Sequence, residues 1–350
     1  MDKFLVTGGA GFIGSHIVKH LLSLNNVKVV VLDNLKATKY LSKLVFIPQI
    51  LSDKFTFIKG DIRDYDTCIK ALKGVHYVLH QGALGSVPRS FDKPSEYHDN
   101  NVVGTDTLFK ACVYMQKKEN NLQRIIQASS SSVYGDIHIL PKNEEIKPKP
   151  KSPYAETKLK CEELGEKYKD IDIISLRYFN VFGSNQSLNS DYSAVFPAFF
   201  NAIKENKPLT IHGDGLQTRD FTYVQNVVNV NVQLALKGAK HSIINVGQGN
   251  SISINQLAKK IIELSDKEVH EIIYTNKRKI IYTKQRNGDV RDTLACTKQL
   301  SKSYNIDDFI NFNIGLSLTA EFYLHDKEYY NKLNNEYLSY FLDKGVENGA

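Results

Sequence analysis

The stretch Phe4-Leu5-Val6-Thr7-Gly8-Gly9-Ala10-Gly11-Phe12-Ile13-Gly14 joins an apolar run to a glycine-rich turn near the start of the chain. Its first four residues are typical of a buried strand, and after the turn apolar residues recur at helical spacing. The pattern GxxGxxG between these elements is formed by Gly8, Gly11 and Gly14. Glycines at such a junction allow a tight turn, a close approach of the backbone to a pyrophosphate, and close packing of helix on strand. The stretch therefore predicts a dinucleotide site.

The segments that follow alternate between strand-like and helix-like patterns. Further strands are predicted at 28–33, 55–58, 77–80, 124–128 and 171–176. Helices are predicted at 12–24, 65–72, 101–116 and 154–168. Repeated strand–helix units predict an α/β fold with a Rossmann-type, doubly wound parallel sheet.

The pattern changes after about residue 178, where loops lengthen and glycine-rich turns appear. We therefore expect residues 1–178 to form a dinucleotide-binding domain, which a strand near 243–247 rejoins. Residues 179–350 are expected to form mainly a smaller, mixed α/β lobe that binds the substrate.

Composition excludes several classes of protein. The chain has 350 residues and a formal net charge of +7, but its basic residues are spread along the sequence without aromatic interleaving. We therefore expect no nucleic-acid partner. No apolar run approaches the length of about 18 residues that indicates a membrane span, and the first strand leaves no room for a signal peptide, so we expect no membrane partner and a cytoplasmic location. The 4 cysteines form no CxxC pair, and no metal site is expected.

Asp33 ends the second predicted strand, downstream of the glycine turn. A carboxylate at this place can accept hydrogen bonds from an adenosine ribose. Its charge would also repel a 2′-phosphate, so the sequence favours NAD over NADP as the cofactor.

A second group of residues predicts chemistry. Tyr154 and Lys158 form Tyr-x-x-x-Lys in a predicted helix, a spacing that places both side chains on one face. The pKa of tyrosine is normally about 10, and a nearby ammonium together with a positively charged nicotinamide favours the phenolate. Upstream, Ser129-Ser130-Ser131-Ser132 follows a predicted strand. Open α/β sheets bind ligands at the carboxyl ends of their strands, and a serine there can hold a substrate oxygen that is being oxidised.

Together these residues resemble the extended short-chain dehydrogenase/reductases, specifically the nucleotide-sugar 4-epimerases. The likeness extends from about residue 3 to 325 and includes Asp61-Ile62, Asp99–Val102, Arg177–Gly183, Arg219–Phe221 and Gly288–Arg291. Leu84–Ser90 is similar to bacterial epimerases that act on UDP-N-acetylhexosamines in O-antigen or capsule synthesis.

The resemblance implies a mechanism. Tyr154 takes the proton of the sugar 4-hydroxyl while the hydride of the same carbon moves to NAD. Ser130 and Ser132 hold the 4-oxygen, and Lys158 bonds the nicotinamide ribose and tunes Tyr154. The 4-keto sugar turns over in the cleft, and the hydride returns to its other face.

The resemblance also assigns binding residues. The implied cofactor contacts are Gly8, Gly11, Phe12, Ile13, Gly14, Asp33, Asn34, Asp61, Ile62, Gln81, Gly82, Asn100, Tyr154, Lys158 and Tyr178. The implied substrate contacts are Ser86, Ser130, Asn180, Gln186, Ala194, Val195, His212, Arg219, Arg286, Asp289 and Thr293. Among these, Arg219 and Arg286 clamp the diphosphate, Asp289 bonds the uridine ribose, and His212 packs on the uracil. Thr293 stands where a bulky Tyr excludes an N-acetyl group in similar enzymes.

The expected function is therefore the NAD-dependent interconversion of UDP-GlcNAc and UDP-GalNAc by a homodimer. Two other 4-epimerase reactions stay open, on UDP-GlcNAcA/UDP-GalNAcA and on UDP-Glc/UDP-Gal. A 4,6-dehydratase is less favoured, because Ser130–Ser132 stands where that enzyme needs a carboxylate. A non-catalytic NAD-sensing protein is disfavoured by the presence of Ser130, Tyr154 and Lys158.

Overall fold

The structure is a computed structural model, and it describes residues 1–36, 44, 53–186, 194–268 and 280–324. The part of the expected lobe beyond residue 324 lies outside these residues.

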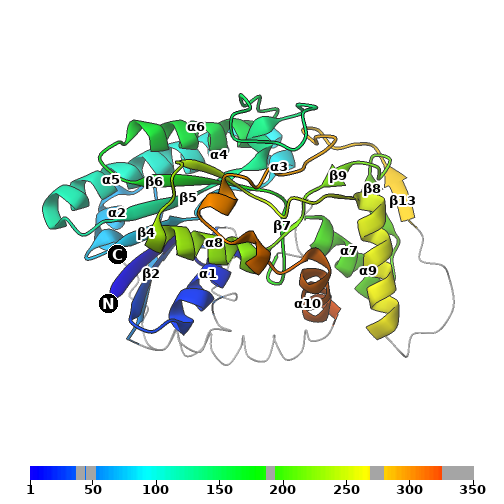
Figure 1. Cartoon of the computed structure of the whole chain (residues 1–350), viewed down its shortest axis with the longest axis horizontal. Helices are drawn as coiled ribbons and strands as arrows, with labels where there is room; N and C mark the ends of the chain where they lie inside the picture. The colour runs from blue at the N-terminus through cyan, green and yellow to red at the C-terminus, as the bar shows by residue number, and fades with distance from the viewer. Residues whose placement is uncertain (37–43, 45–52, 187–193, 269–279, 325–350) are drawn as a thin grey trace.

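A seven-stranded parallel sheet forms the centre of the part of the molecule on the left of Figure 1. Its strand order is β11-β6-β5-β4-β1-β2-β3. Its strands are β1 (Asp2–Thr7), β2 (Val27–Asp33), β3 (Phe55–Lys59), β4 (Tyr77–His80), β5 (Arg124–Ser130), β6 (Ile173–Tyr178) and β11 (Ile243–Val246). The order reverses between β1 and β4. This is the place where doubly wound sheets bind their ligands.

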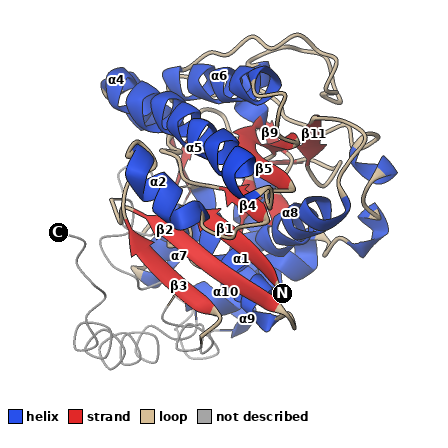
Figure 2. Ribbon diagram, turned by 90° about the vertical axis from the view of Figure 1, so that its left-hand side faces the viewer, coloured by secondary structure: helices blue, strands red, loops and turns tan. Residues whose placement is uncertain are grey.

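Helices cover both faces of the sheet, as Figure 2 shows. Helices α1 (Phe12–Ser23) and α8 (Val224–Lys237) pack together on one face, and α2 (Tyr65–Leu72), α5 (Gly104–Glu119) and α6 (Pro153–Lys167) lie on the other. The short helices α3 (Val87–Asp92) and α4 (Pro94–Tyr97) lead into a π-helical turn, η2 (His98–Val103), and a 3-10 turn, η3 (Ser131–Tyr134), follows β5.

The central strands are apolar on both sides because each side meets helices. In β2, Val29 and Val31 join the core under α1 and α8, whereas Val30 and Leu32 join the core under α2 and α5. A continuous apolar run is therefore what a central parallel strand requires.

The second lobe has its own core, rich in aromatic residues. Phe182 and Phe196 stack with ring centroids 4.4 Å apart and belong to a cluster that also contains Leu209 and Leu257. The elements of the lobe are β7 (Val181–Phe182), α7 (Val195–Lys204), β8 (Leu209–His212), β9 (Thr218–Arg219), β10 (Thr222–Tyr223), β12 (Ile252–Ser253), α9 (Ile254–Glu268), β13 (Ile280–Thr283) and α10 (Phe312–Leu324). The short turns η4 (Leu300–Lys302) and η5 (Ile306–Asp308) pack instead against the core of the sheet.

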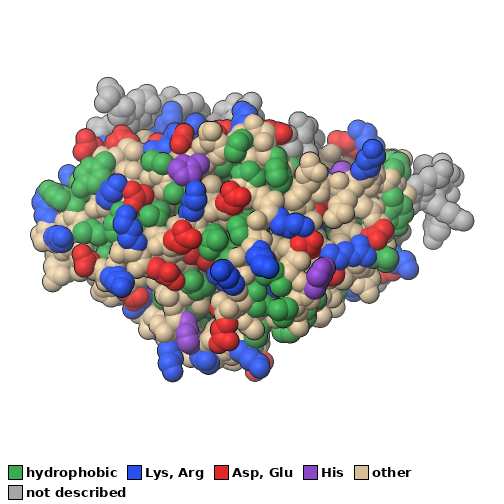
Figure 3. All heavy atoms as spheres, turned by 90° about the horizontal axis from the view of Figure 1, so that it is seen from above, with side chains coloured by type: hydrophobic (Ala, Val, Ile, Leu, Met, Phe, Trp, Pro, Cys, Tyr) green, Lys and Arg blue, Asp and Glu red, His purple; other side chains and the backbone are tan. Residues whose placement is uncertain are grey.

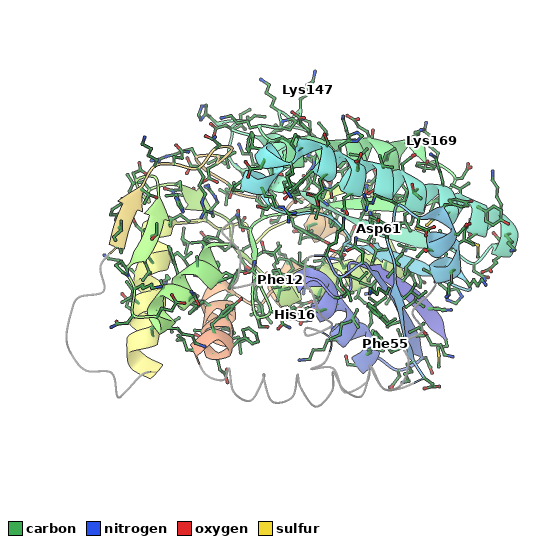
Figure 4. All side chains as sticks on the ribbon, turned by 180° about the vertical axis from the view of Figure 1, so that it is seen from behind. Phe12, His16, Phe55, Asp61, Lys147 and Lys169 are labelled. Carbon is green, nitrogen blue, oxygen red and sulfur yellow. The ribbon has the colours of Figure 1, made fainter. Side chains whose placement is uncertain are left out.

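The predicted fold class is confirmed, and β11 rejoins the sheet beside β6 as expected. The structure also shows helix α8 packed on one face of the sheet, a helix that the sequence pattern did not single out. Within the described residues, no helix is long and apolar enough to cross a membrane, and no group of three or more His, Cys, Asp or Glu side chains is arranged to hold a metal. Lys147, in the basic loop before α6, extends away from the body of the molecule (Figure 4).

Candidate active site

The glycine turn between β1 and α1 is as tight as the sequence predicts. Gly8 has a φ of +67°, and a Cβ on Gly14 would lie 2.2 Å from the Gly8 carbonyl oxygen. Gly11 caps α1, and among the described residues no side chain caps it and no acid lies in its first turn. The N-terminal N–H groups and the positive end of the helix dipole can therefore bind an anion without a competing side chain.

This turn opens into a cavity at the carboxyl ends of β1, β2, β4 and β5, which we call the glycine-loop cavity. Of the predicted cofactor contacts, its lining includes Gly8, Gly11, Phe12, Ile13, Gly14, Asp33, Asn34, Ile62, Gln81, Gly82, Asn100, Tyr154, Lys158 and Tyr178. Asp61 is the one predicted contact that the structure does not bring to this cavity.

The two predicted acids of the cavity region have different surroundings. The Asp33 carboxylate accepts hydrogen bonds from the backbone N–H groups of Ala10 (3.0 Å) and Leu35 (2.8 Å) and lines the cavity. Asp61 instead binds the Arg63 guanidinium and accepts from Asn34 Nδ2 at 2.9 Å. The Arg63 contact holds the Asp61 pKa well below its usual range. Asp61, which is labelled in Figure 4, therefore orients the side chain of Asn34, and Asn34 lines the cavity.

Helix α6 carries Tyr154 and Lys158 on the face turned to the sheet. Ser152 caps the helix by accepting a hydrogen bond from the Ala155 N–H at 3.2 Å, and Pro153 occupies the first turn. The Lys158 ammonium donates to the Ala128 carbonyl oxygen at 2.8 Å. Both the tyrosine and the lysine are therefore held at the end of β5.

The expected phenolate of Tyr154 rests on two cations, Lys158 and the nicotinamide, and the protein's own groups do not lower the pKa of Tyr154. Burial raises the pKa of Tyr154 to about 12, and the hydrogen bond with Ser130 opposes this shift only in part. Burial likewise lowers the pKa of Lys158, whose ammonium is directed to the Ala128 carbonyl. The protein by itself thus holds Tyr154 as the neutral phenol.

The serine run forms a compact hydrogen-bonded loop at the end of β5. Ser130 Oγ accepts from the Ser132 N–H at 3.1 Å and lies 2.8 Å from Ser132 Oγ. The two hydroxyls line a second cavity, the serine-loop cavity, together with Tyr154, Gln186 and Thr293. Because Tyr154 lines both cavities, it stands at their junction.

A third cavity, the lobe cavity, is lined by Ala194, Val195, His212, Arg286, Asn180, Arg219 and Asp289. The last three also line the serine-loop cavity, so the two spaces adjoin. His212 lies 2.8 Å from the Thr283 hydroxyl, and burial lowers its pKa, which favours the neutral ring. Burial also lowers the pKa of Arg219.

Two predicted sugar contacts have roles inside the protein. Ser86 Oγ caps α3 by accepting from the Arg89 N–H at 3.4 Å, and Ser86 does not line the three cavities. Thr293 lines the serine-loop cavity, but its hydroxyl accepts from the Asp220 N–H (3.1 Å) and donates to Asn180 Oδ1 (3.3 Å). The position of this wall is therefore fixed by hydrogen bonds.

Sequence reasoning missed further lining residues. Ser129 faces the first two cavities, Lys151 and Val87 line the serine-loop cavity, and Gln217 lines the lobe cavity. Ser129 adjoins the predicted Ser130 in the sequence, and Lys151 precedes the predicted Tyr154 by three positions, so a short extension of each motif would have found them. Gln217 carries no such local signal.

These features define a dinucleotide-dependent enzyme of the epimerase type, and comparison with known proteins agrees. Residues 4–247 match the NAD dependent epimerase/dehydratase family. The chain belongs to this family, and the predictions of an NAD-dependent enzyme and of NAD as its cofactor are confirmed.

Solved structures narrow the likeness to nucleotide-sugar enzymes. The UDP-N-acetylglucosamine 4-epimerase from Methanobrevibacter ruminantium, in complex with UDP-N-acetylmuramic acid, is 36% identical with a TM-score of 0.80, over 92% of this chain and 98% of that one. The UDP-glucuronic acid 4-epimerase from Bacillus cereus, in complex with UDP-glucuronic acid and NAD, is 32% identical with a TM-score of 0.78, over 92% of this chain and 99% of that one.

Relatives found by sequence include a dehydratase. The human dTDP-D-glucose 4,6-dehydratase is 33% identical over 269 residues, which are 75% of this chain and 73% of that protein.

Proposed function

We propose that the chain is a UDP-sugar 4-epimerase that interconverts UDP-GlcNAc and UDP-GalNAc. The observation that carries this proposal is the order of the three cavities. The glycine-loop cavity meets the serine-loop cavity at Tyr154, and the serine-loop cavity meets the lobe cavity at Asn180, Arg219 and Asp289. A dinucleotide, a sugar and a nucleoside diphosphate fit this order, with the sugar between the other two.

The glycine-loop cavity suits NAD. Its glycines leave no space for side chains next to the helix N-terminus, and Asp33 places a carboxylate where an adenosine ribose would lie. In this proposal Gly11, Phe12, Ile13 and Gly14 hold the pyrophosphate, and Lys158 binds the nicotinamide ribose. When bound there, NAD supplies an acceptor for the hydride of sugar carbon 4.

Side chains of the protein bind the oxygen of the sugar 4-hydroxyl and exchange its proton. Ser130 and Ser132 orient the sugar 4-hydroxyl. Tyr154, as its phenolate, receives the hydroxyl proton as the carbonyl forms and returns that proton when the sugar is reduced. Because burial disfavours the Tyr154 phenolate, and because Lys158 is the cation nearest in the sequence on the same helix face, we assign Lys158 the role of stabilising the phenolate during the transfer.

The lobe cavity suits a uridine diphosphate. Arg219 and Arg286 present guanidinium groups, which bind phosphate oxygens as forked donors. In this proposal Asp289 accepts hydrogen bonds from the ribose hydroxyls and the neutral His212 ring packs against the base; both residues line the lobe cavity. We assign the sugar contacts to Gln186 and Thr293, with Ala194 and Val195 next to the nucleoside.

A neutral N-acetylated sugar is favoured over a uronic acid. Thr293 is small, so the wall has room for an N-acetyl group. Lys151 and Arg219 are the cations among the described residues that line the serine-loop cavity, and Lys151 is paired with Asp136 at 2.9 Å. In this proposal Arg219 serves the diphosphate, which leaves the sugar carboxylate of a uronic acid without a partner. The likeness to a solved UDP-N-acetylglucosamine 4-epimerase supports the same choice.

The wider setting is also a proposal. We propose that residues 1–178 with β11 bind NAD, and that residues 179–350 mainly bind the UDP-sugar. We propose a cytoplasmic homodimer that pairs through α5 and α6 and supplies O-antigen or capsule synthesis. On the face of the molecule that Figure 3 shows, hydrophobic and charged side chains are interspersed. In helix α5, Tyr114 is 47% exposed.

The test is a parallel assay of the purified protein with UDP-GlcNAc, UDP-GlcNAcA and UDP-Glc. We expect conversion of UDP-GlcNAc to UDP-GalNAc, seen by anion-exchange chromatography and NMR, with the highest kcat/KM of the three. A higher kcat/KM for UDP-GlcNAcA or UDP-Glc would overturn the substrate assignment. A 4-keto-6-deoxy product would identify a dehydratase, and no turnover of any nucleotide sugar would remove the enzymatic proposal.

A further inference from the structure

A row of three polar side chains crosses the sheet beneath helix α6. In the strand register, Ser129 of β5 pairs with Arg177 of β6, and Arg177 pairs with Asn245 of β11. Directly paired residues in neighbouring strands project to the same face of a sheet. All three are at most 3% exposed, so the row is buried under the helix that carries Tyr154 and Lys158.

Glu162 meets this row from α6, one helical turn beyond Lys158. Arg177 donates two hydrogen bonds to its carboxylate, from Nε at 2.9 Å and from Nη2 at 2.8 Å. Ser129 Oγ donates to the same carboxylate at 2.5 Å. The side chains of Arg177 and Glu162 are each 2% exposed, so the contact is a fully buried, bidentate ion pair.

Tyr134 completes the arrangement from the other side of the serine loop. Its ring lies 4.7 Å from the Arg177 guanidinium, and its hydroxyl donates to Asn245 Oδ1 at 2.8 Å. Tyr134 ends the 3-10 turn that contains Ser132. The row therefore contacts both segments that carry the proposed chemistry, the turn after β5 and helix α6.

Stability alone does not account for such a pair. Removing two charges from water is costly, and apolar residues of similar volume often replace a buried ion pair with no loss of stability. The pair instead constrains geometry, because its two parallel N–H···O bonds fix the distance and angle between strand β6 and helix α6. Ser129 fastens β5 to α6 through its hydrogen bond to Glu162, and its neighbour Ser130 carries the hydroxyl that meets Ser132 in the serine-loop cavity.

We propose that Glu162 and Arg177, with Ser129, are positioning residues for the proposed epimerase reaction. They set the spacing between the serine hydroxyls at the end of β5 and the Tyr154–Lys158 face of α6. This inference rests on the proposed function, because it concerns the transfer between Tyr154 and a sugar hydroxyl held by Ser130.

The test is the double variant Glu162→Leu/Arg177→Met, which removes the directional contacts without leaving a buried charge. We expect Tm to stay near that of the wild type and KM for UDP-GlcNAc to change little. We expect kcat to fall about 10-fold to 100-fold, since a misplacement of about 1 Å in a reacting group has a cost of this order. The control is Arg124→Met/Asp172→Leu, which removes a more exposed ion pair at the other end of β5 and should leave kcat unchanged.

Ser129→Ala provides a second, milder variant, in which the ion pair keeps both charges. Its kcat should fall about 3-fold to 10-fold, with KM unchanged, because one of three hydrogen bonds to the carboxylate is lost. A folded double variant or Ser129→Ala with wild-type kcat would overturn the positioning role, and so would an equal loss in the control pair. If the wild type itself turns over no UDP-sugar, the proposed function fails instead.

Discussion

The glycine-loop cavity and the lobe cavity are built by different means. The first is formed largely by backbone: Gly8 and Gly14 approach neighbouring main chain so closely that a Cβ would lie less than 3.0 Å from it. The second is formed by side chains from separate segments, such as His212 at the end of β8 and Arg286 after β13. Backbone geometry constrains the local sequence, whereas side chains can be exchanged without changing the fold.

This difference explains how one family can act on several sugars with one cofactor. Changes in the glycine-loop cavity alter the backbone path, so they should abolish cofactor binding. Changes in the serine-loop and lobe cavities should instead redistribute substrate preference. The solved relatives, which carry different sugars on the same fold, agree with this division.

The largest effect is expected at the junction of the two cavities. Tyr154→Phe removes the group that exchanges the proton but leaves the shape of both cavities. We expect kcat to fall by at least about 100-fold, as is usual for loss of a general base, while NAD and UDP bind as before in calorimetry. Tyr65→Phe, at an exposed position in α2, is the control. Retention of more than about a tenth of the rate, under about 1.4 kcal/mol in the barrier, would mean that another base is used.

The next effect tests the backbone-built cavity. In Gly14→Ala the new Cβ would collide with the Gly8 carbonyl at 2.2 Å, and Gly85→Ala has no atom within 4 Å of its Cβ. We expect Gly14→Ala to purify without NAD and to lose about 100-fold in NAD affinity, about 2.7 kcal/mol. Gly85→Ala should retain far more of the cofactor. Equal NAD content in the two variants, measured by absorbance after denaturation, would contradict a cavity made by close backbone contact.

A smaller effect is expected from the side-chain wall. Thr293→Tyr should reduce kcat/KM for UDP-GlcNAc about 10-fold to 100-fold, because steric exclusion from a packed wall costs roughly 1–3 kcal/mol. The same change should spare UDP-Glc. The structure calls for Thr293→Val as a control, since the tyrosine also removes the hydroxyl that meets the Asp220 N–H. If the valine variant shifts the preference as strongly as the tyrosine variant, the hydrogen bond and not the size of residue 293 controls selection.

The smallest effects concern stability and pH, and the two halves should respond in opposite directions. Burial lowers the pKa of His80 from 6.5 to about 3. The unfolded chain then binds the proton more readily, and the free energy of unfolding rises with pH over this interval. Burial raises the pKa of Asp220, beside Arg219, from 3.8 to about 6. Here the folded chain binds the proton more readily, and the free energy of unfolding falls as pH rises through the interval.

Between about pH 4 and 6 the two contributions oppose each other, each by at most about 1.4 kcal/mol per pH unit. Relative to the wild type, His80→Gln should make the free energy of unfolding fall more steeply with rising pH. Asp220→Asn should make it rise more steeply. Urea titrations across this range measure both slopes, and identical slopes in all three proteins would show that neither group titrates as described.

The sequence predicted the backbone-built half closely, because its signals are local. The glycine turn, Asp33 and the Tyr154–Lys158 pair lie within single strand–helix units, and all of them line the expected cavity. The predicted NAD contact that failed to reach it, Asp61, is a side chain whose direction depends on Arg63 and Asn34.

The side-chain half was less accessible to sequence reasoning. Nothing in the run around Ser86 reveals that its hydroxyl caps α3, since serines that cap and serines that bind sugar share the same chemistry. The ion pair of Glu162 and Arg177 joins a helix to a strand, and its partners are recognisable only once β5 and β6 are in register. The pKa of Tyr154 depends on burial, which the sequence does not contain.

The position of β11 has a consequence for synthesis on the ribosome. This strand, Ile243–Val246, pairs with β6, although the elements from β7 to α8 lie between them in the chain and the elements from β12 to α10 follow β11. Until it emerges, β6 is the edge of the growing sheet and presents unpaired backbone groups. A nascent chain that stops after residue 178 therefore exposes an edge strand that can pair with another chain. The lobe also cannot be exchanged between relatives by a simple C-terminal fusion. A transplanted lobe must be built from two segments, one before β11 and one after it, with β11 kept between them.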